Sequence, residues 1–84
     1  MADTFKIEIA TPEKLVLDTS AEAAQIPGAD GYLGILPGHA ALLSELGAGD
    51  LTVTSGGKSQ VFKITGGYVE VRDNHVRVLA DSAE

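Results

Sequence analysis

The chain has 84 residues, enough for one domain and too few for two, and it contains no cysteine. Disulfides and thiolate zinc sites are therefore excluded, and stability must come from a thin core of packed aliphatic side chains. A formal net charge of −6 argues against nucleic acid as a ligand, because no cluster of Lys and Arg is present to neutralise phosphates.

Alternation of apolar and polar residues predicts strands in the first part of the chain. Residues 4–10 alternate cleanly, and the break at Pro12 separates them from a second alternating segment, residues 14–18. Residues 22–26 are rich in alanine and suit either a helical turn or a strand, and Pro27 ends this segment.

Glycines then recur every three or four residues from Gly28 to Gly38. They bracket a short strand predicted over residues 32–36, and the Pro37-Gly38 dipeptide predicts a turn after it. Residues 39–46 have the composition of a helix, but glycines close the segment within a few residues. We favour short extended pieces here.

The second half of the chain has the clearest pattern. We expect four strands, over residues 51–54, 59–65, 68–72 and 75–80. The sequence Ser55-Gly56-Gly57-Lys58 predicts a hairpin turn, Gly66-Gly67 a bulge or tight bend, and Asp73-Asn74 a second tight turn.

These elements predict an all-β fold in a single domain, residues 1–84. Eight to ten short strands, with a turn about every eight residues, are typical of a flattened β-sandwich or barrel. A helical pattern of 10–12 residues is absent from the sequence, which excludes βαβ units.

One tripeptide, Gly57-Lys58-Ser59, copies the end of a phosphate-binding P-loop. The full motif needs a glycine where Thr52 stands and a helix after the serine, whereas a strand is predicted there. We therefore interpret the tripeptide as part of a hairpin turn. No cofactor site is predicted from it.

The two histidines do not predict a metal centre, because neither has further ligands at a suitable spacing. His75 is expected to be solvated beside a turn, as are carboxylates such as Glu8 and Asp18. His39 is either a hydrogen-bonded loop residue or a partner contact. A third interpretation, an enzyme using His39, requires an ionisable partner beside it, and no catalytic triad order is recognised.

Large apolar residues are concentrated in the middle of the chain: Tyr32, Leu33, Ile35, Leu36, Leu42, Leu43 and Leu46. A thin core does not have room for all of them. Either alternate residues fill the core, or some form an exposed patch for a protein partner.

Membrane insertion is not expected, because no apolar run approaches the roughly 20 residues of a membrane span. The N-terminus also lacks the basic and apolar regions of a signal peptide. If the protein works at a membrane, we expect another protein to carry it there.

Three motifs resemble a known family. The segment GYLGILPGHAALL at residues 31–43 resembles the G-x-L-G-I-x-P-G-H-A-P-L-L signature of the epsilon subunit of F-type ATP synthases. GGYVEV at 66–71 and NHVRVLAD at 74–81 resemble its G-G-x-x-E-V and N-x-V-x-V-L-A-D motifs. The resemblance covers nearly the whole chain, and the first motif is highly specific.

This resemblance implies a β-sandwich of about ten strands that is followed, in the family, by two C-terminal helices. The chain stops at Glu84, where those helices would begin, so we expect the N-terminal β-domain alone, as a truncated or naturally short form. Inhibition of ATP hydrolysis and ATP binding belong to the helices in the family. No bound nucleotide or other cofactor is therefore expected here.

The family also implies a role and two partners. The epsilon subunit is a non-catalytic part of the central stalk that couples ion-driven rotation to ATP synthesis, at the cytoplasmic face of the bacterial cell membrane. The resemblance assigns contact with the ring of c subunits to Ala29, Asp30, Gly31 and Tyr32. It assigns contact with the gamma subunit to His39, Ala41, Leu42, Leu43 and Ser44.

The alternative is a free-standing β-sandwich that binds a small ligand or sugar. Such a module should expose aromatic side chains in a groove. The chain offers four aromatic residues for this purpose: Phe5, Tyr32, Phe62 and Tyr68.

Overall fold

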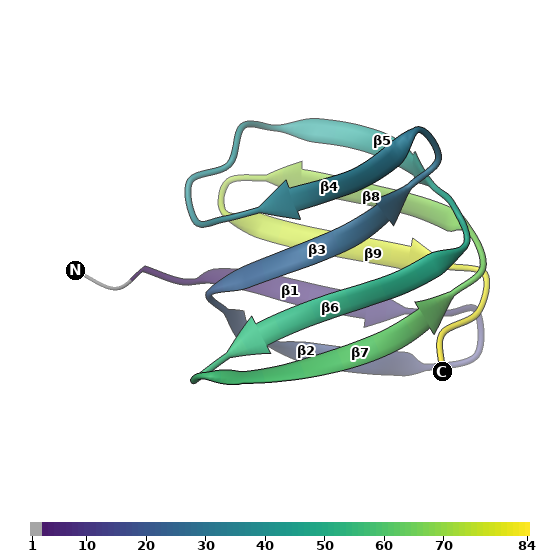
Figure 1. Ribbon diagram of the computed structural model, residues 1–84, viewed down its shortest axis with the longest axis horizontal. Coiled ribbons are helices and arrows are strands. Elements are labelled where there is room, and N and C mark those ends of the chain that lie inside the picture. The colour runs from purple at the N-terminus through teal and green to yellow at the C-terminus, as the bar shows by residue number, and fades with distance from the viewer. Residues whose placement is uncertain (1–2) are drawn as a thin grey trace.

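The computed structural model describes residues 3–84, and these residues form nine β-strands in two layers (Figure 1). The strands are β1 (Phe5–Ala10), β2 (Leu15–Ala21), β3 (Ala23–Gly28), β4 (Gly31–Ile35), β5 (Leu42–Leu46), β6 (Gly49–Ser55), β7 (Lys58–Ile64), β8 (Gly67–Arg72) and β9 (His75–Ala80). The all-β prediction is confirmed, and nine strands fall within the predicted eight to ten. Residues 3–84 contain no helix of a length and apolarity that would cross a bilayer.

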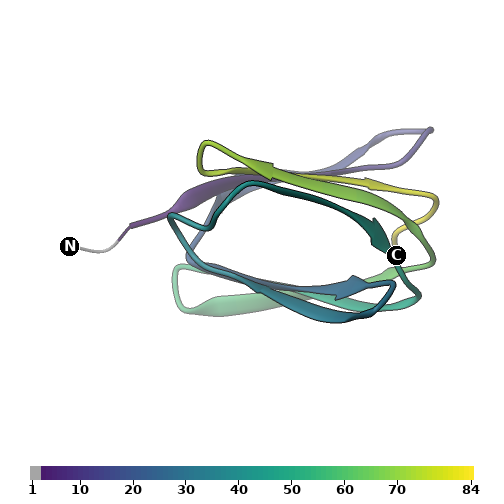
Figure 2. The same cartoon turned by 90° about the horizontal axis from the view of Figure 1, so that it is seen from above.

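The two layers face each other across a narrow interior (Figure 2). One contains β2, β1, β9, β8 and β5 in that spatial order, and the other contains β4, β3, β6 and β7. Neighbouring strands pair antiparallel, except that β1 and β9 are parallel. This parallel pair places the first and last strands side by side.

Backbone hydrogen bonds join the two layers at both edges. At one edge the Gly47 N–H donates to the Pro27 carbonyl at 2.8 Å, which ties the end of β5 to β3. At the other the Glu22 N–H donates to the Thr54 carbonyl at 2.8 Å, which ties the end of β2 to β6. The sandwich is thus closed into a flattened barrel by ladder-like contacts.

The core fills the space between the layers, because alternate residues of each strand point inward. The buried apolar side chains are Phe5, Ile7, Ile9, Ala21, Ala24, Ile26, Ile35, Leu46, Leu51, Val53, Ile64, Val69, Val71, Val76, Val78 and Ala80. They include the apolar residues that the alternation of β1, β8 and β9 marks as inward-facing.

The two segments with an ambiguous composition are both extended. Residues 22–26 contribute most of β3, which pairs with β4 on one side and β6 on the other. Residues 42–46 form β5, which pairs with β8 over its whole length. Ladder hydrogen bonds and inward packing outweigh the helical propensity of Ala, Leu and Glu in these short segments.

The predicted hairpin turns are confirmed. Gly56 and Gly57 have φ angles of 60° and 78° between paired residues Ser55 and Lys58, as a two-residue hairpin requires. Strand β7 follows directly, so the tripeptide that resembles a P-loop has no helix N-terminus to hold a phosphate. Asp73 and Asn74 likewise have positive φ angles of 52° and 62°.

Candidate functional site

The first predicted contact segment and the start of the second lie at opposite ends of the sandwich. The second segment then runs along β5 back toward the first, and the residue after Ser44 is hydrogen-bonded to Ala29. Residues 29–30 form the turn between β3 and β4, and Gly31 and Tyr32 begin β4. His39 and Ala41 lie in the connection between β4 and β5, at the other end of β4, as Figure 1 shows. The strands run the length of the molecule between these two ends.

The turn between β3 and β4 is exposed but firmly anchored. The Ala29 N–H donates to the Glu45 carbonyl at 2.9 Å. The Tyr32 hydroxyl accepts a hydrogen bond from the Asp50 N–H at 3.0 Å, and Tyr32 is paired with Pro27 across the hairpin. Asp30, at the tip, is exposed and offers a carboxylate to solvent. The turn can therefore present charge on a rigid support.

The connection between β4 and β5 begins with a tight turn. The His39 N–H donates to the Leu36 carbonyl at 3.1 Å, and Gly38 between them has a φ of +83°. Proline followed by a glycine with this φ angle is the arrangement of a type II turn. Pro37 and Gly38 thus fix the backbone that carries His39.

Asn74 holds this connection in place from the opposite hairpin. Its Oδ1 accepts a hydrogen bond from the Gly38 N–H at 2.8 Å, and its Nδ2 donates to the Thr4 carbonyl at 2.7 Å. The sequence predicted Asn74 only as a turn residue. Its second role depends on a contact 36 residues away in the chain, for which a local pattern carries no signal.

The His39 side chain is partly buried and bonds within its own loop. Its Nδ1 lies 2.7 Å from the Ala40 carbonyl oxygen, which can only accept, so Nδ1 carries the proton. Within residues 3–84, the structure gives His39 no hydrogen bond or ion pair with an ionisable side chain. The geometry matches the hydrogen-bonded loop residue among the interpretations of His39.

Strand β5 divides the apolar residues of the middle segment between interior and surface. Leu42 and Ser44 face inward and are half-buried, whereas Leu43 faces outward and is 73% exposed. Ile35 and Leu46 are buried, while Tyr32 and Leu36 are exposed. Alternate residues thus fill the core, as the first interpretation of the apolar surplus has it, and the others remain at the surface. Their use as a patch for a protein partner stays a prediction.

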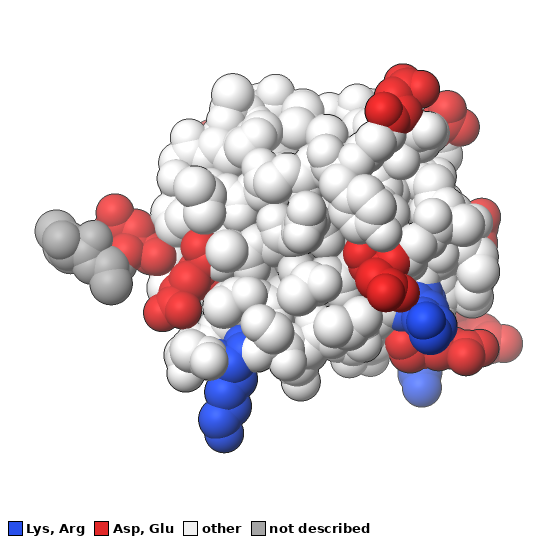
Figure 3. All heavy atoms as spheres, in the orientation of Figure 1, with Lys and Arg blue, Asp and Glu red and all other residues white. Residues whose placement is uncertain are grey.

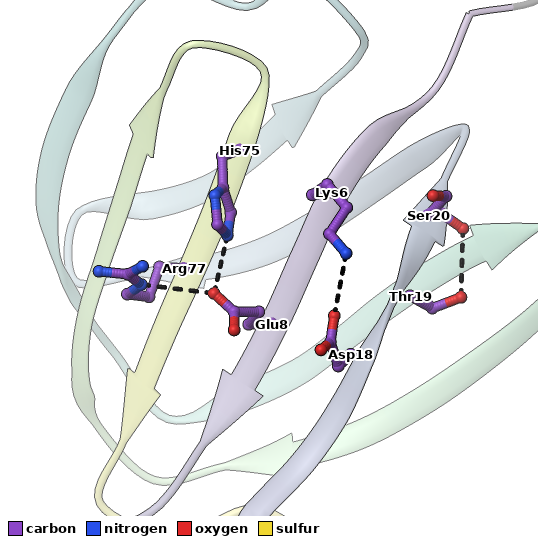
Figure 4. Close-up of polar contacts among 7 residues, drawn as sticks. All are labelled: Lys6, Glu8, Asp18, Thr19, Ser20, His75 and Arg77. Atoms are coloured by element: carbon purple, nitrogen blue, oxygen red, sulfur yellow. Dashed lines mark hydrogen bonds and ion pairs between the residues drawn. The ribbon is translucent and has the colours of Figure 1, made fainter.

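The outer face of the β2–β1–β9–β8–β5 layer carries a polar network that the sequence did not predict (Figure 4). His75 Nε2 donates to Glu8 Oε1 at 2.7 Å, and Arg77 Nε donates to the same oxygen at 3.4 Å. Lys6 and Asp18 form a nearby ion pair at 3.5 Å. The expectation that His75 and Glu8 are simply solvated is therefore wrong, because both are half-buried and bonded to each other, whereas Asp18 is exposed as expected. The parallel β1–β9 pair brings His75 and Glu8 together.

Hydrogen bonding alters the acidity of this network. The bond from His75 is the largest influence on the Glu8 carboxyl and, together with that from Arg77, holds its pKa below its ordinary value of 4.5. The charged form of Glu8 is thus favoured in the folded state.

Glu8→Gln is expected to flatten the acid side of the stability curve. Because the folded pKa lies below the unfolded one, the contribution of the carboxylate is complete above about pH 4.5 and is lost as pH falls through the folded value. Wild type should be the more stable protein at neutral pH, and its advantage should shrink as pH falls below about 4.5 and through the lower pKa of the folded state. Urea unfolding at a series of pH values measures the difference in unfolding free energy between wild type and Glu8→Gln. A difference that does not depend on pH would contradict the prediction.

The outer face of the other layer is different. Figure 3 views this face, most of which is uncharged, with a few separate acidic and basic groups on it. A shallow apolar hollow of about 410 Å³ opens there, lined in part by Gln25, Gly34 and Thr52. The four aromatic residues do not line it: Phe5 is buried, Phe62 is partly buried, and Tyr32 and Tyr68 lie on different layers.

Metal-binding chemistry has no support in the part of the chain that the structure describes. Within residues 3–84, no group of three or more His, Cys, Asp or Glu side chains is placed to hold an ion.

Comparison with known proteins gives consistent matches. Residues 4–84 match the family model described as "ATP synthase, Delta/Epsilon chain, beta-sandwich domain". The chain is 50% identical to the ATP synthase epsilon chain of Solibacter usitatus over 84 residues, which are 100% of this chain and 63% of that protein. It is also 50% identical to the epsilon chain of Koribacter versatilis, of which it covers 59%. The chain therefore spans about three fifths of the length of these relatives.

Two solved structures share the fold. A chain of the Euglena gracilis mitochondrial ATP synthase, in a structure of OSCP, F1 and the c-ring, superimposes with a TM-score of 0.91 at 26% identity, covering 96% of this chain and 52% of that one. A chain of the Tetrahymena thermophila mitochondrial ATP synthase central stalk and c-ring gives a TM-score of 0.81 at 23% identity, covering 94% and 64%. The second likeness concerns the fold alone.

Proposed function

The chain belongs to the delta/epsilon-chain β-sandwich family of ATP synthase, and from this we propose that it is a non-catalytic rotor subunit of such an enzyme. It would bind the gamma subunit and the c ring, and it would couple ion-driven rotation to ATP synthesis carried out by other subunits. The observation that carries the proposal is that two surface turns, the one at Asp30 and the one that leads to His39, lie at opposite ends of β4. Two partners can then be engaged at once without competing for one surface.

The architecture suits the transmission of force. All nine strands of residues 3–84 run between the two ends, so a load applied at one end travels along extended backbone and its hydrogen-bonded ladders. Bonds between the layers at Gly47–Pro27 and Glu22–Thr54 resist sliding of one layer over the other. A coupling element needs such stiffness, because a compliant one would absorb the rotation.

Charge supports the choice of partner surfaces. The net charge of −6 and the exposed Asp30 at the tip of the β3–β4 turn favour contact with basic loops on the c ring or gamma. We place the protein at the cytoplasmic face of a bacterial cell membrane, held there through the complex. Nucleotide is not needed for this role.

Leu43→Asp is expected to weaken binding to the isolated gamma subunit by at least about tenfold. Leu43 is the most exposed large apolar side chain of residues 3–84, so its replacement removes a candidate anchor without opening the core. Leu42→Asp would be a poorer test, because Leu42 packs against the core. Titration calorimetry of the chain against purified gamma measures the affinity, with circular dichroism as the check on folding.

Val61→Asp is the matched control. Val61 is also exposed, but it lies on β7 in the other layer, away from the proposed gamma contact. Equal affinity for both variants would argue against the proposed contact. A folded chain without measurable affinity for gamma would favour a ligand-binding module, with the hollow beside Gly34 as its first candidate site.

A further inference from the structure

We propose that Asn74 is a positioning residue that holds the β4–β5 connection, residues 36–41, in the conformation that meets the gamma subunit. The connection carries His39 and leads into β5, so this role rests on the proposed function. Asn74 lies in the turn between β8 and β9 and is not one of the predicted contact residues. It acts through the backbone on which those residues stand.

Asn74 joins three parts of the chain at one end of the sandwich. Its Oδ1 accepts a hydrogen bond from the Gly38 N–H at 2.8 Å, and its Nδ2 donates to the Thr4 carbonyl at 2.7 Å. Its backbone carbonyl accepts a hydrogen bond from the Lys6 N–H at 3.0 Å. Figure 1 shows the start of β1, the β4–β5 connection and the β8–β9 turn together at this end. The start of β1 therefore anchors Asn74, and Asn74 anchors the connection.

Asparagine meets two separate requirements at this position. The Gly38 N–H can only donate and the Thr4 carbonyl can only accept, so the side chain must offer both an acceptor and a donor, as an amide does. Residue 74 also has a φ of 62°, a conformation that asparagine adopts more readily than most residues with a side chain. Aspartate would keep the acceptor but lose the donor, and glycine would keep the backbone but lose both bonds.

The connection has little else to hold it. None of residues 36–41 is buried, so packing in the core does not fix their conformation. The bond from the His39 N–H to the Leu36 carbonyl and that between His39 Nδ1 and the Ala40 carbonyl both lie within the connection. Outside the strand ladders of residues 3–84, the Gly38–Asn74 bond is the only hydrogen bond that ties the connection to another segment.

A connection held in one conformation binds a partner more tightly than one that samples several. The apparent affinity of a flexible segment falls by the fraction of time that it spends in the binding conformation. A single hydrogen bond shifts such an equilibrium about two- to tenfold. Asn74 therefore raises the affinity for gamma without touching it, because it raises the fraction of molecules that are ready to bind.

Asn74→Gly tests this role with little damage to the turn. Residues 73 and 74 both have positive φ angles, and Asp-Gly is a preferred pair for a two-residue hairpin of this kind. We expect the association rate constant for purified gamma, measured by surface plasmon resonance, to fall about two- to tenfold. The dissociation rate constant should stay within about twofold of wild type, because the bound state keeps the same contact residues. Deuterium exchange followed by NMR should be faster at the Gly38 amide.

Asp73→Gly is the matched control in the same turn. Asp73 is exposed, has a positive φ, and forms no ion pair or side-chain hydrogen bond within residues 3–84. The control should associate with gamma like wild type. Equal slowing in both variants would show a general loosening of the turn and would overturn the proposal. Faster dissociation of Asn74→Gly at an unchanged association rate would overturn it too, since Asn74 would then contact gamma directly.

Two results separate the positioning role from the proposed function. If wild type binds gamma and a folded Asn74→Gly chain has the same rate constants, the positioning role is wrong and the proposed function stands. If folded wild type has no affinity for gamma, both are overturned. Unchanged exchange at the Gly38 amide of Asn74→Gly would also refute the positioning role, because the side chain would then not hold the connection.

Discussion

Gly67→Ala is expected to destabilise the domain by about 3 kcal/mol or more. Gly67 has a φ of +122°, a region that residues with a side chain rarely adopt. A Cβ at this position would lie 2.0 Å from the Leu79 carbonyl oxygen and 2.9 Å from the Ala80 Cα. Both obstacles are backbone atoms of β9, so no side-chain rotation can relieve the contact. The β8–β9 ladder would have to open at this end.

Gly34→Ala is the control that separates the steric clash at residue 67 from the general effect of replacing a glycine by alanine. Gly34 lies in β4, and a Cβ added to it would meet no atom within 4 Å. We expect its stability to stay within about 0.5 kcal/mol of wild type, because an unstrained alanine also restricts the unfolded chain. Thermal unfolding followed by circular dichroism compares the two variants. If Gly67→Ala unfolds at the same temperature as Gly34→Ala, then the close contact between residue 67 and the backbone of β9 does not limit stability.

Local patterns in the sequence were sufficient for the strands with clean alternation. The inward positions of Ile7 in β1, Val69 in β8 and Val78 in β9 follow from a period of two residues, and all three are buried. The extended state of residues 22–26 and 42–46 was less certain from composition, because alanine, leucine and glutamate suit a helix as well, although short extended pieces were favoured for residues 39–46 and are confirmed in β5. Their pairing with distant strands decides the outcome, and sequence periodicity does not report which strands will be neighbours.

The same limit explains what was missed at the site. Asp30 and His39 are close in sequence, yet β4 runs between them and carries them to opposite ends, whereas β5 brings Ser44 back toward the first end. Glu8 and His75 are 67 residues apart and meet only because β1 and β9 are parallel neighbours. Asn74 reaches Gly38 for a similar reason. A resemblance to a family supplies such candidate residues, but their geometry depends on the strand order.

Ile7→Ala is expected to cost about 2–5 kcal/mol of unfolding free energy. Ile7 is fully buried in β1, where it is paired with Thr19 of β2 and Val76 of β9. Its truncation removes buried methyl and methylene groups and leaves a cavity between rigid ladders that cannot collapse easily. A domain of this length has a total stability of roughly 4–12 kcal/mol, so the variant approaches the point at which a large fraction of molecules is unfolded.

Urea unfolding at 25 °C measures the loss, and two further variants test its cause. Ile7→Val removes one buried methylene and should cost only about 1 kcal/mol, whereas Val61→Ala, at the surface, should stay within about 0.5 kcal/mol of wild type. This graded order follows if packing between the layers holds β1 against β9. Equal losses for Ile7→Val and Ile7→Ala would instead indicate that backbone pairing, rather than side-chain packing, holds β1 in place. In the graded case, Ile7→Ala should also weaken the proposed binding to gamma in proportion to its unfolded fraction, while the affinity of the molecules that remain folded is unchanged.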